Sequence, residues 1–190
     1  MKIIAPSVDL VDIINAEEIL LKIERCGRVC YQSEPKGNPE SFIRMLIKRG
    51  HESVLEHASL TFHIICDRAI LAELTRHRLC AFSVESTRYV KYDELVTVQE
   101  NDIVYNVMAF WTENAYKGLL QQGYPPEIAR AVLPLCLKTE LYMTANLREW
   151  RHILKLRTAK AAHPQMRQIA GMILAVFKEK LPVIVEDIQS

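Results

Sequence analysis

The densest group of polar side chains in the sequence is Arg76-His77-Arg78. Its guanidinium groups concentrate positive charge in a chain whose formal net charge is only +1. The planar fork of arginine suits a phosphate or pyrophosphate, because charge-assisted hydrogen bonds are stronger than neutral ones. Basic residues near the C-terminal end of a helix also stabilise the helix dipole without any ligand. The group alone therefore leaves an anion site and a structural role equally open.

A second polar segment lies just downstream and favours the anion site. Ser86, Thr87 and Arg88 supply hydroxyls, backbone N–H groups and a third guanidinium. If this segment is extended, Ser86 and Arg88 point to the same side of the chain and could hold one phosphate together. We therefore predict a phosphate site that combines residues 76–78 with residues 86–88.

The overall composition is that of an ordinary globular protein and limits which anions are plausible ligands. Of the 190 residues, 49% are hydrophobic and 25% are charged, which fits one domain with a sizeable core. General binding to nucleic acid would require a basic excess that the chain lacks. Asp9 and Asp12 interrupt the apolar start, so we expect no secretory signal, and no apolar run is long enough to cross a membrane. A cytoplasmic location is therefore the default expectation.

The cysteines give no sign of a disulfide framework or a metal centre. Their number is odd and they are scattered, which suits a reducing compartment. No second pair of cysteines or histidines completes a zinc pattern around the first two. We expect all of them to be plain core or surface residues: Cys26, Cys30, Cys66, Cys80 and Cys136.

Hydrophobic periodicity and capping residues predict interleaved helices and strands. Clean alternation predicts strands over 58–66 and 137–145. Residues 76–90 are predicted to be irregular or extended. Helices are predicted over 16–30, after the cap Asn38, after the cap Asp67, over 106–120, from Pro125-Pro126 to near Pro134, around 147–154 and from Pro164. The interleaving indicates a mixed α and β class.

Residues 76–89, RHRLCAFSVESTRY, resemble the signature of flavin-dependent thymidylate synthases. In that signature Arg-His-Arg is followed after seven residues by serine and two residues later by arginine, a spacing that this chain reproduces. Residues 50–64 and 156–170 resemble two further segments of the family, and RVCYQS at 28–33 resembles a third. Together these stretches span most of the chain.

The resemblance implies a single domain over residues 1–190, with a mixed α/β (α+β) fold in which helices flank a central, mostly antiparallel sheet. It also implies a homotetramer whose active sites are shared between subunits. The implied reaction is the reductive methylation of deoxyuridine monophosphate (dUMP) to thymidylate (dTMP). In that reaction NADPH reduces FAD, methylenetetrahydrofolate donates one carbon, and reduced flavin supplies the hydride that completes the methyl group. Whether the carbon travels directly or through the flavin stays open.

The resemblance also implies which side chains contact each ligand. The implied dUMP contacts are Glu73, Arg76, Glu85, Ser86, Thr87, Arg88 and Arg167. Ser86 and Arg88 match the residues that grip the phosphate. Arg167 matches an arginine that lies against the uracil and stabilises the charge developing on it, so Arg167 and Ser86 are the expected catalytic residues. The implied FAD contacts are His51, Ser53, Arg76, His77, Arg78, Lys155, Arg157 and His163. No metal is implied.

Three positions depart from the family pattern. Ala81 stands where many members carry serine, and Glu73 stands where a glutamine often binds the nucleotide. Glu140 lies in a region where some members have a nucleotide-binding arginine. The signature arginines and serine remain, so the departures concern how the nucleotide is held more than which reaction is catalysed.

Two other enzyme classes are less consistent with the residues. The first is a metal hydrolase, because HESVLEH at 51–57 superficially resembles a zinc-binding helix. The spacing does not fit: H-E-x-x-H would need histidine at Leu55, and H-x-x-E-H would need it at Ser53. The cysteine-based thymidylate synthases use a nucleophilic cysteine, and the segment ending at Cys136 faintly resembles theirs. Because Cys136 follows an apolar helix end and enters a predicted strand, a core role is expected for it.

A non-enzymatic protein that binds nucleotides or nucleic acid is the remaining alternative. Tryptophan on the apolar face of a helix, as predicted for Trp150, usually belongs to the core. The chain also lacks the basic excess of nucleic-acid surfaces, whereas a nucleotide-sized pocket needs only a few arginines. Such a surface would have to use Arg76, Arg78, Arg88, Arg148 and Arg151.

Overall fold

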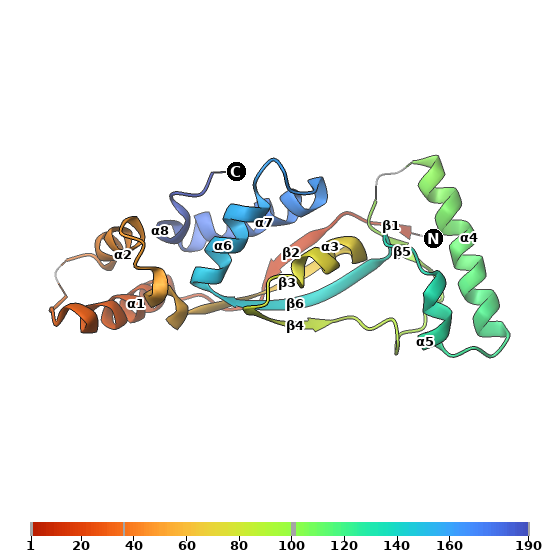
Figure 1. Cartoon of the computed structure of the whole chain (residues 1–190), viewed down its shortest axis with the longest axis horizontal. Coiled ribbons are helices and arrows are strands. Elements are labelled where there is room, and N and C mark those ends of the chain that lie inside the picture. Colours follow the sequence, from red (N-terminus) through yellow and green to blue (C-terminus); the bar gives the residue numbers. More distant parts are fainter. Residues whose placement is uncertain (1, 36, 100–101, 190) are drawn as a thin grey trace. The chain divides into compact units, whose positions relative to one another are not determined.

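The computed structural model of the chain describes residues 2–35, 37–99 and 102–189. Helices and strands alternate along it, which confirms the mixed α and β class (Figure 1). Its contacts divide the chain into two compact units. The first unit consists of Met1–Ser7, Ile64–Arg76 and Phe82–Tyr142, and the second of Val8–His63, His77–Ala81 and Met143–Ser190. The single-domain organisation expected from the sequence stays a prediction.

The larger of the two sheets has two central strands that alternation had predicted. Its strand order is β2 (Ser7–Leu10), β3 (Ser59–Asp67), β6 (Lys138–Asn146) and β4 (Cys80–Val84). Strands β3 and β6 are antiparallel, because Leu147 N donates to Ala58 O at one end and Arg68 N donates to Leu135 O at the other. One face of β3 is buried to 2% exposure or less, through Leu60, Phe62, Ile64 and Cys66. The antiparallel sheet is therefore confirmed for the central pair.

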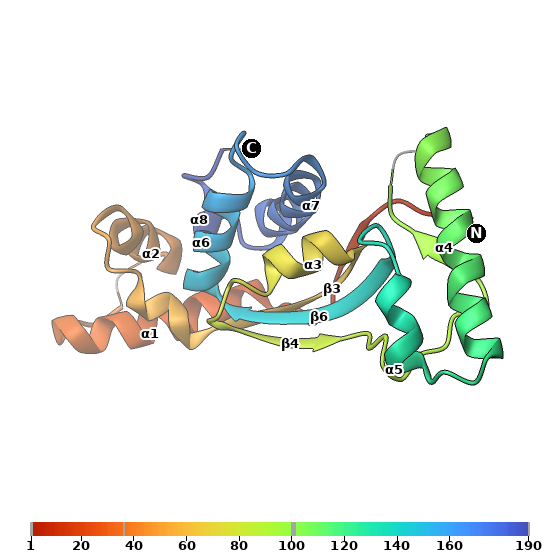
Figure 2. The ribbon, with the colours of Figure 1, turned by 45° about the vertical axis from the view of Figure 1, so that its right-hand side comes forward.

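The second unit consists mainly of helices packed on one another. They are α1 (Ala16–Tyr31), α2 (Pro39–Lys48), η1 (Glu52–His57), α6 (Leu147–Arg157), α7 (Pro164–Lys180) and α8 (Pro182–Val185). Helices α6 and α7 lie side by side in both views (Figure 2). Their shared core is aromatic: the rings of Phe62 and Trp150 meet edge-on with centroids 5.0 Å apart, and Phe177 packs against both. Trp150 Nε1 donates to Leu60 O at 3.0 Å, so this buried indole is satisfied.

The first unit contains a short helix, a long helix and a small parallel sheet. Its elements are β1 (Lys2–Ile3), α3 (Arg68–Leu74), β5 (Val96–Thr97), α4 (Ile103–Gln121), α5 (Pro126–Ala129) and η2 (Arg130–Val132). Asp67 caps α3 as predicted, since its Oδ1 accepts a hydrogen bond of 2.7 Å from Ile70 N. The helix predicted to end near Pro134 is instead a single α turn followed by a 3₁₀ turn.

Among the residues that the structure describes, no helix combines the length and the hydropathy needed to span a bilayer. This includes α4, which has 19 residues but carries polar side chains along its length.

Candidate functional site

His77 differs from the two arginines beside it in being buried. It follows α3 in a turn that leads to β4, and 5% of it is exposed. Arg76 and Arg78 are both exposed. The sequence group that was predicted to act as one cluster is therefore divided, with two surface guanidinium groups and one interior imidazole.

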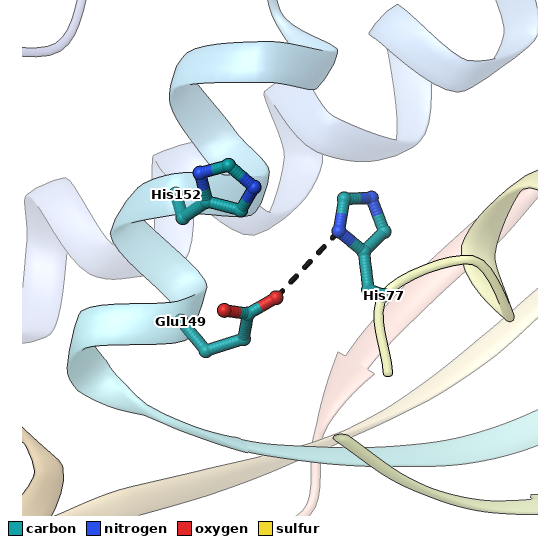
Figure 3. A group of neighbouring side chains, drawn as sticks. All are labelled: His77, Glu149 and His152. Carbon is teal, nitrogen blue, oxygen red and sulfur yellow. Dashed lines mark ion pairs between the residues drawn. The ribbon is translucent and has the colours of Figure 1, made fainter. Parts of the chain in front are cut away.

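Helix α6 supplies the groups that contact the His77 ring (Figure 3). Arg157 Nε donates a hydrogen bond of 3.0 Å to His77 Nε2, and Glu149 Oε1 lies 3.6 Å from His77 Nδ1. The ring of His152 is edge-on, with its centroid 6.0 Å from that of His77. The α6 N-cap, Asn146, accepts a hydrogen bond of 2.8 Å from Glu149 N. The structure therefore brings together two of the expected flavin residues, His77 and Arg157.

The His77 imidazole is neutral at pH 7. Burial, and after it the positive charges of Arg157 and His152, lower the pKa of His77 to about 4. The contact with Glu149 therefore joins a carboxylate to a neutral N–H group and is not a salt bridge.

His77, Glu149 and His152 are also residue types that bind metal ions, and a potential ligand atom of each lies within 4.8 Å of the others. A histidine ligand must present a lone pair to the metal. Because a guanidinium can only donate, the bond from Arg157 places the His77 lone pair on Nε2 and the hydrogen on Nδ1. The nitrogen that faces Glu149 is thus the protonated one, which does not suit a metal centre. The expected absence of a metal stays a prediction.

An open cavity of about 660 Å³ adjoins this group in the second unit. Glu149, His152 and Lys155 of α6 line it together with Leu79. Lys155 Nζ lies 3.0 Å from Asp187 Oδ2, so the cation is held at the rim by a carboxylate. The cavity offers a planar ligand both apolar and charged surface.

The other expected flavin residues lie elsewhere in the second unit and are exposed. His51 precedes the 3₁₀ helix η1, and its Nδ1 lies 2.8 Å from Tyr31 Oη. Ser53 is an exposed residue of η1. His163 caps α7, because its Nδ1 accepts a hydrogen bond of 3.3 Å from Gln165 N. Their approach to a common ligand stays a prediction.

Ser86 begins a turn, so beyond the end of β4 the chain takes the irregular one of the two forms predicted for residues 76–90, and not the extended one. Its Oγ accepts a hydrogen bond of 3.2 Å from Arg88 N, and its carbonyl accepts from Tyr89 N and Val90 N. Serine favours this geometry because its hydroxyl bonds to backbone two residues ahead. The same-side argument for Ser86 and Arg88 therefore does not apply. A turn still places backbone N–H groups close to the serine hydroxyl.

Carboxylates hold the charged side chains around this turn. Arg88 Nε donates to Glu127 at 3.0 Å on the surface. Glu85 accepts from Tyr92 Oη at 2.6 Å and from Lys138 Nζ at 2.8 Å. Burial, and then the hydrogen bond to Glu85, raise the pKa of Tyr92. Glu85 is therefore engaged within the first unit, and a nucleotide contact would have to share it.

Sequence reasoning missed two arginines beside the turn. Arg68 and Arg130 line a cavity of about 370 Å³ in the first unit, together with Thr87 and an otherwise mainly apolar wall. Arg68 donates to Thr139 and Arg130 donates to Thr87, each over a long 3.4 Å. Arg68 directly follows the cap of α3 and Arg130 lies in a helical turn, so each had looked like an ordinary helix residue. Two guanidinium groups that make only long hydrogen bonds, in a partly apolar cavity, suit an anionic nucleotide.

The three departures from the family pattern have different settings. Lys138 Nζ lies 2.8 Å from Glu140 and shares the same face of β6, so a lysine two residues earlier offsets the negative charge. Glu73 is half-buried on α3, and Ala81 is exposed on β4.

Arg167 is half-buried. It lies in the first turn of α7, and its Nη1 donates to the carbonyl of Lys160 at 3.0 Å. This bond links the helix to the loop before it. The guanidinium is thereby held near the positive end of the α7 dipole.

The alternative nucleic-acid surface loses two of its members. Arg151 is 1% exposed and pairs with Asp187 and Glu52. Arg148 pairs with Glu56, and Trp150 is fully buried. Of the two α6 arginines in that surface, Arg151 is therefore interior, and the charge of the exposed Arg148 is offset by a carboxylate.

Comparison with known proteins shows which fold and family the chain shares. In fold, the chain is similar to the crystal structure of a UMP/dUMP methylase, PolB of Streptomyces cacaoi, bound with 5-Br dUMP. That match has a TM-score of 0.83 and 26% identity, and it covers 98% of this chain and 96% of the other. The architecture is thus shared with a class of nucleotide methylases.

Relatives found by sequence identify a family within that class of nucleotide methylases. Over 198 residues the chain is 35% identical to the probable flavin-dependent thymidylate synthase of Mycobacterium phage L5, covering 87% of this chain and 79% of the phage protein. It is 31% identical to the flavin-dependent thymidylate synthase of Corynebacterium efficiens, covering 88% and 78%. Residues 10–183 match the family described as thymidylate synthase complementing protein, and the chain belongs to that family.

Proposed function

We propose that the chain is a flavin-dependent thymidylate synthase that methylates dUMP to dTMP. In this proposal FAD is the cofactor, methylenetetrahydrofolate donates the carbon and NADPH is the reductant. Family membership over residues 10–183 carries the proposal. The pair that the neutral His77 imidazole forms with the Arg157 guanidinium also supports it, because it joins the signature at residues 76–89 to the family-like segment at 156–170.

The second unit has the chemistry that FAD requires. FAD combines a pyrophosphate with a planar ring, so its site needs cations and fixed hydrogen-bond donors. Arg157 is such a donor, because His77 anchors it at Nε. The other FAD contacts that we propose are taken from the family resemblance, whichever unit they belong to: His51, Ser53, Arg76, Arg78, Lys155 and His163. When bound, reduced flavin supplies the hydride that completes the methyl group.

The first unit has the chemistry that a nucleotide phosphate requires. The Ser86 turn offers a hydroxyl and backbone N–H groups, and Arg68 and Arg130 add positive charge beside an apolar wall. The proposed dUMP contacts, taken from the family resemblance, are Glu73, Arg76, Glu85, Ser86, Thr87, Arg88 and Arg167. Arg167 would stabilise negative charge that develops on the uracil.

The absorbance spectrum of the purified chain and a turnover assay test the function. We expect bound flavin and NADPH-dependent conversion of dUMP to dTMP in the presence of methylenetetrahydrofolate. UMP should serve as the comparison substrate, since the similar PolB is named for both nucleotides. A chain that neither binds added FAD nor converts dUMP would refute the proposal, and equal turnover of UMP would refute its preference for deoxyuridylate.

Ser86→Ala is expected to raise the Kd for dUMP about 10-fold, because a hydrogen bond to a charged group contributes roughly 1.5 kcal/mol. The turn itself should persist, since Tyr89 N and Val90 N bond to the backbone carbonyl of residue 86. Isothermal titration measures the Kd. Ser83→Ala, which removes an exposed hydroxyl from β4, is the matched control. An unchanged Kd in Ser86→Ala would remove Ser86 from the phosphate site.

Helix α4 supports the proposed homotetramer with shared active sites. Its N-terminal half exposes several large apolar side chains, and exposed apolar residues that gather in this way mark protein interfaces. The residues are Ile103, Val104, Tyr105, Val107, Met108, Phe110 and Trp111, each between 49% and 76% exposed. A second copy of the chain is the occupant that shared active sites require.

Trp111→Glu is therefore expected to dissociate the tetramer, because a charge would be buried in an apolar interface. Light scattering coupled to gel filtration measures the mass. Gln121→Glu adds the same charge in the last turn of α4 and should leave the mass unchanged. A tetramer that survives Trp111→Glu would show that this surface is not the interface.

A further inference from the structure

We propose that His77 is a positioning residue, which orients Arg157 from one ring nitrogen while the Glu149 carboxylate faces the other. Its effect on flavin binding would pass through Arg157 and not through a direct contact of the imidazole. The inferred effect on flavin binding rests on the proposed function, whereas the inferred tautomer and contacts of the His77 ring do not depend on it.

The direction of the Arg157 bond fixes the tautomer of His77. A guanidinium has N–H groups and no acceptor, so Arg157 Nε must donate across the 3.0 Å to His77 Nε2. Nε2 therefore carries the lone pair. Because the buried ring is neutral, its single hydrogen is on Nδ1.

Glu149 stabilises that tautomer from the other side of the ring. Its Oε1 faces Nδ1 at 3.6 Å, and its side chain is only 10% exposed. A carboxylate at this distance favours a hydrogen on Nδ1 over a lone pair there. Both partners of His77 come from α6, whose N-cap bond to Glu149 N fixes the start of the helix. One rigid helix thus holds both sides of the imidazole.

The remaining ionisable groups beside the ring do not reverse this assignment. His152 lies edge-on, and a positive charge there would disfavour a second proton on His77. Cys80 follows on the same segment, and burial together with Glu149 raises the pKa of its thiol to about 12, so it stays neutral.

Each ring nitrogen of His77 thus already faces a side chain of α6. Nε2 accepts from Arg157, and Nδ1 lies 3.6 Å from the Glu149 carboxylate, so a flavin that bonded to the ring would compete with one of these side chains. What His77 contributes is the direction of the Arg157 guanidinium, which is half-buried at the end of α6. The central residue of Arg-His-Arg is therefore assigned to internal positioning, and its exposed neighbours remain the candidates for ligand contact.

Nitrogen NMR of the unmodified chain, labelled with ¹⁵N-histidine, tests the arrangement without any substitution. At pH 7 we expect the His77 signals of a neutral ring with the hydrogen on Nδ1, the tautomer that free histidine does not favour. Glu149→Gln should keep this tautomer, because the amide oxygen still accepts, and Glu149→Leu should shift it toward Nε2–H. A charged ring, or Nε2–H in the unmodified chain, would overturn the inference.

A double-mutant cycle on FAD affinity tests the route to the ligand. His77→Leu is expected to weaken FAD binding about tenfold, and His77→Gln, which restores an acceptor for Arg157, to recover most of it. In the Arg157→Leu background, His77→Leu should have no further effect. Independent, multiplying effects would show a direct contact and overturn the inference. If the unmodified chain bound no FAD, the proposed function would fail, and the NMR result would still decide the tautomer.

Discussion

Replacing Arg167 by alanine is expected to lower kcat by about 10²- to 10³-fold while the chain stays folded. The proposed reaction builds negative charge on a pyrimidine, and a fixed guanidinium stabilises such charge most in the transition state. Arg167 lies in the first turn of α7, so the helix dipole adds to its positive field. The bond to the Lys160 carbonyl holds the side chain in place before substrate arrives.

Turnover of dUMP and thermal unfolding should be measured together for this variant. Losing the bond to Lys160 is expected to cost about 1 kcal/mol of stability, far less than the cost in rate. Arg167→Lys keeps the charge without the planar fork, so its turnover should lie between that of the unmodified chain and that of Arg167→Ala. Gln168→Ala, at an exposed neighbour on the same helix, is the control. Near-normal turnover of Arg167→Ala would remove this residue from the mechanism.

The sequence predicted the elements whose boundaries are set by local chemistry. Asn38 and Asp67 cap α2 and α3, since each side chain accepts a backbone N–H at the predicted position. Alternation identified the central strands because one face of each is buried. The short strands β1, β2 and β5 were missed, because two to four residues are too few to show a period.

Residue types also predicted which segments carry the candidate site, but they could not show how each side chain is directed. His77 and its flanking arginines are equally polar in sequence, and only the contacts with α6 separate the buried ring from them. Arg151 had looked like a surface cation because its partner Asp187 is 36 residues away. Long-range pairs of this kind depend on tertiary structure, which no local pattern contains.

That pair underlies the largest expected effect on stability. Arg151 is 1% exposed, and it donates to Asp187, to Glu52 and to the carbonyl of Ile184. Its Nε has no partner among the described residues, so the buried charge relies on these bonds. Asp187→Ala removes two of the contacts and is expected to lower the free energy of unfolding by about 2–3 kcal/mol, less than for a fully buried pair because Glu52 remains.

Arg151→Met should cost less than Asp187→Ala, because it removes the buried charge together with its requirement for partners. The matched control is Glu186→Ala, which breaks a surface pair with Arg44 and should cost less than about 1 kcal/mol. Urea unfolding measures all three variants. If Arg151→Met lowered the free energy of unfolding more than Asp187→Ala did, the Arg151–Asp187 pair itself would stabilise the fold. The cost of an unpaired buried charge would then not explain the effect of Asp187→Ala.

The pH dependence of unfolding tests the same pair independently. The hydrogen bonds from Arg151 lower the pKa of Asp187 well below its usual range. The ionised carboxylate therefore stabilises the fold fully above about pH 4, the pKa of an unfolded aspartate, and this contribution is lost as the pH falls through the lower pKa of the folded state. Asp187→Ala lacks that contribution at every pH, so its deficit relative to the unmodified chain should shrink on acidification. If the difference in unfolding free energy between Asp187→Ala and the unmodified chain stayed constant from pH 7 to below about pH 4, packing and not the ion pair would account for the lower stability of the variant.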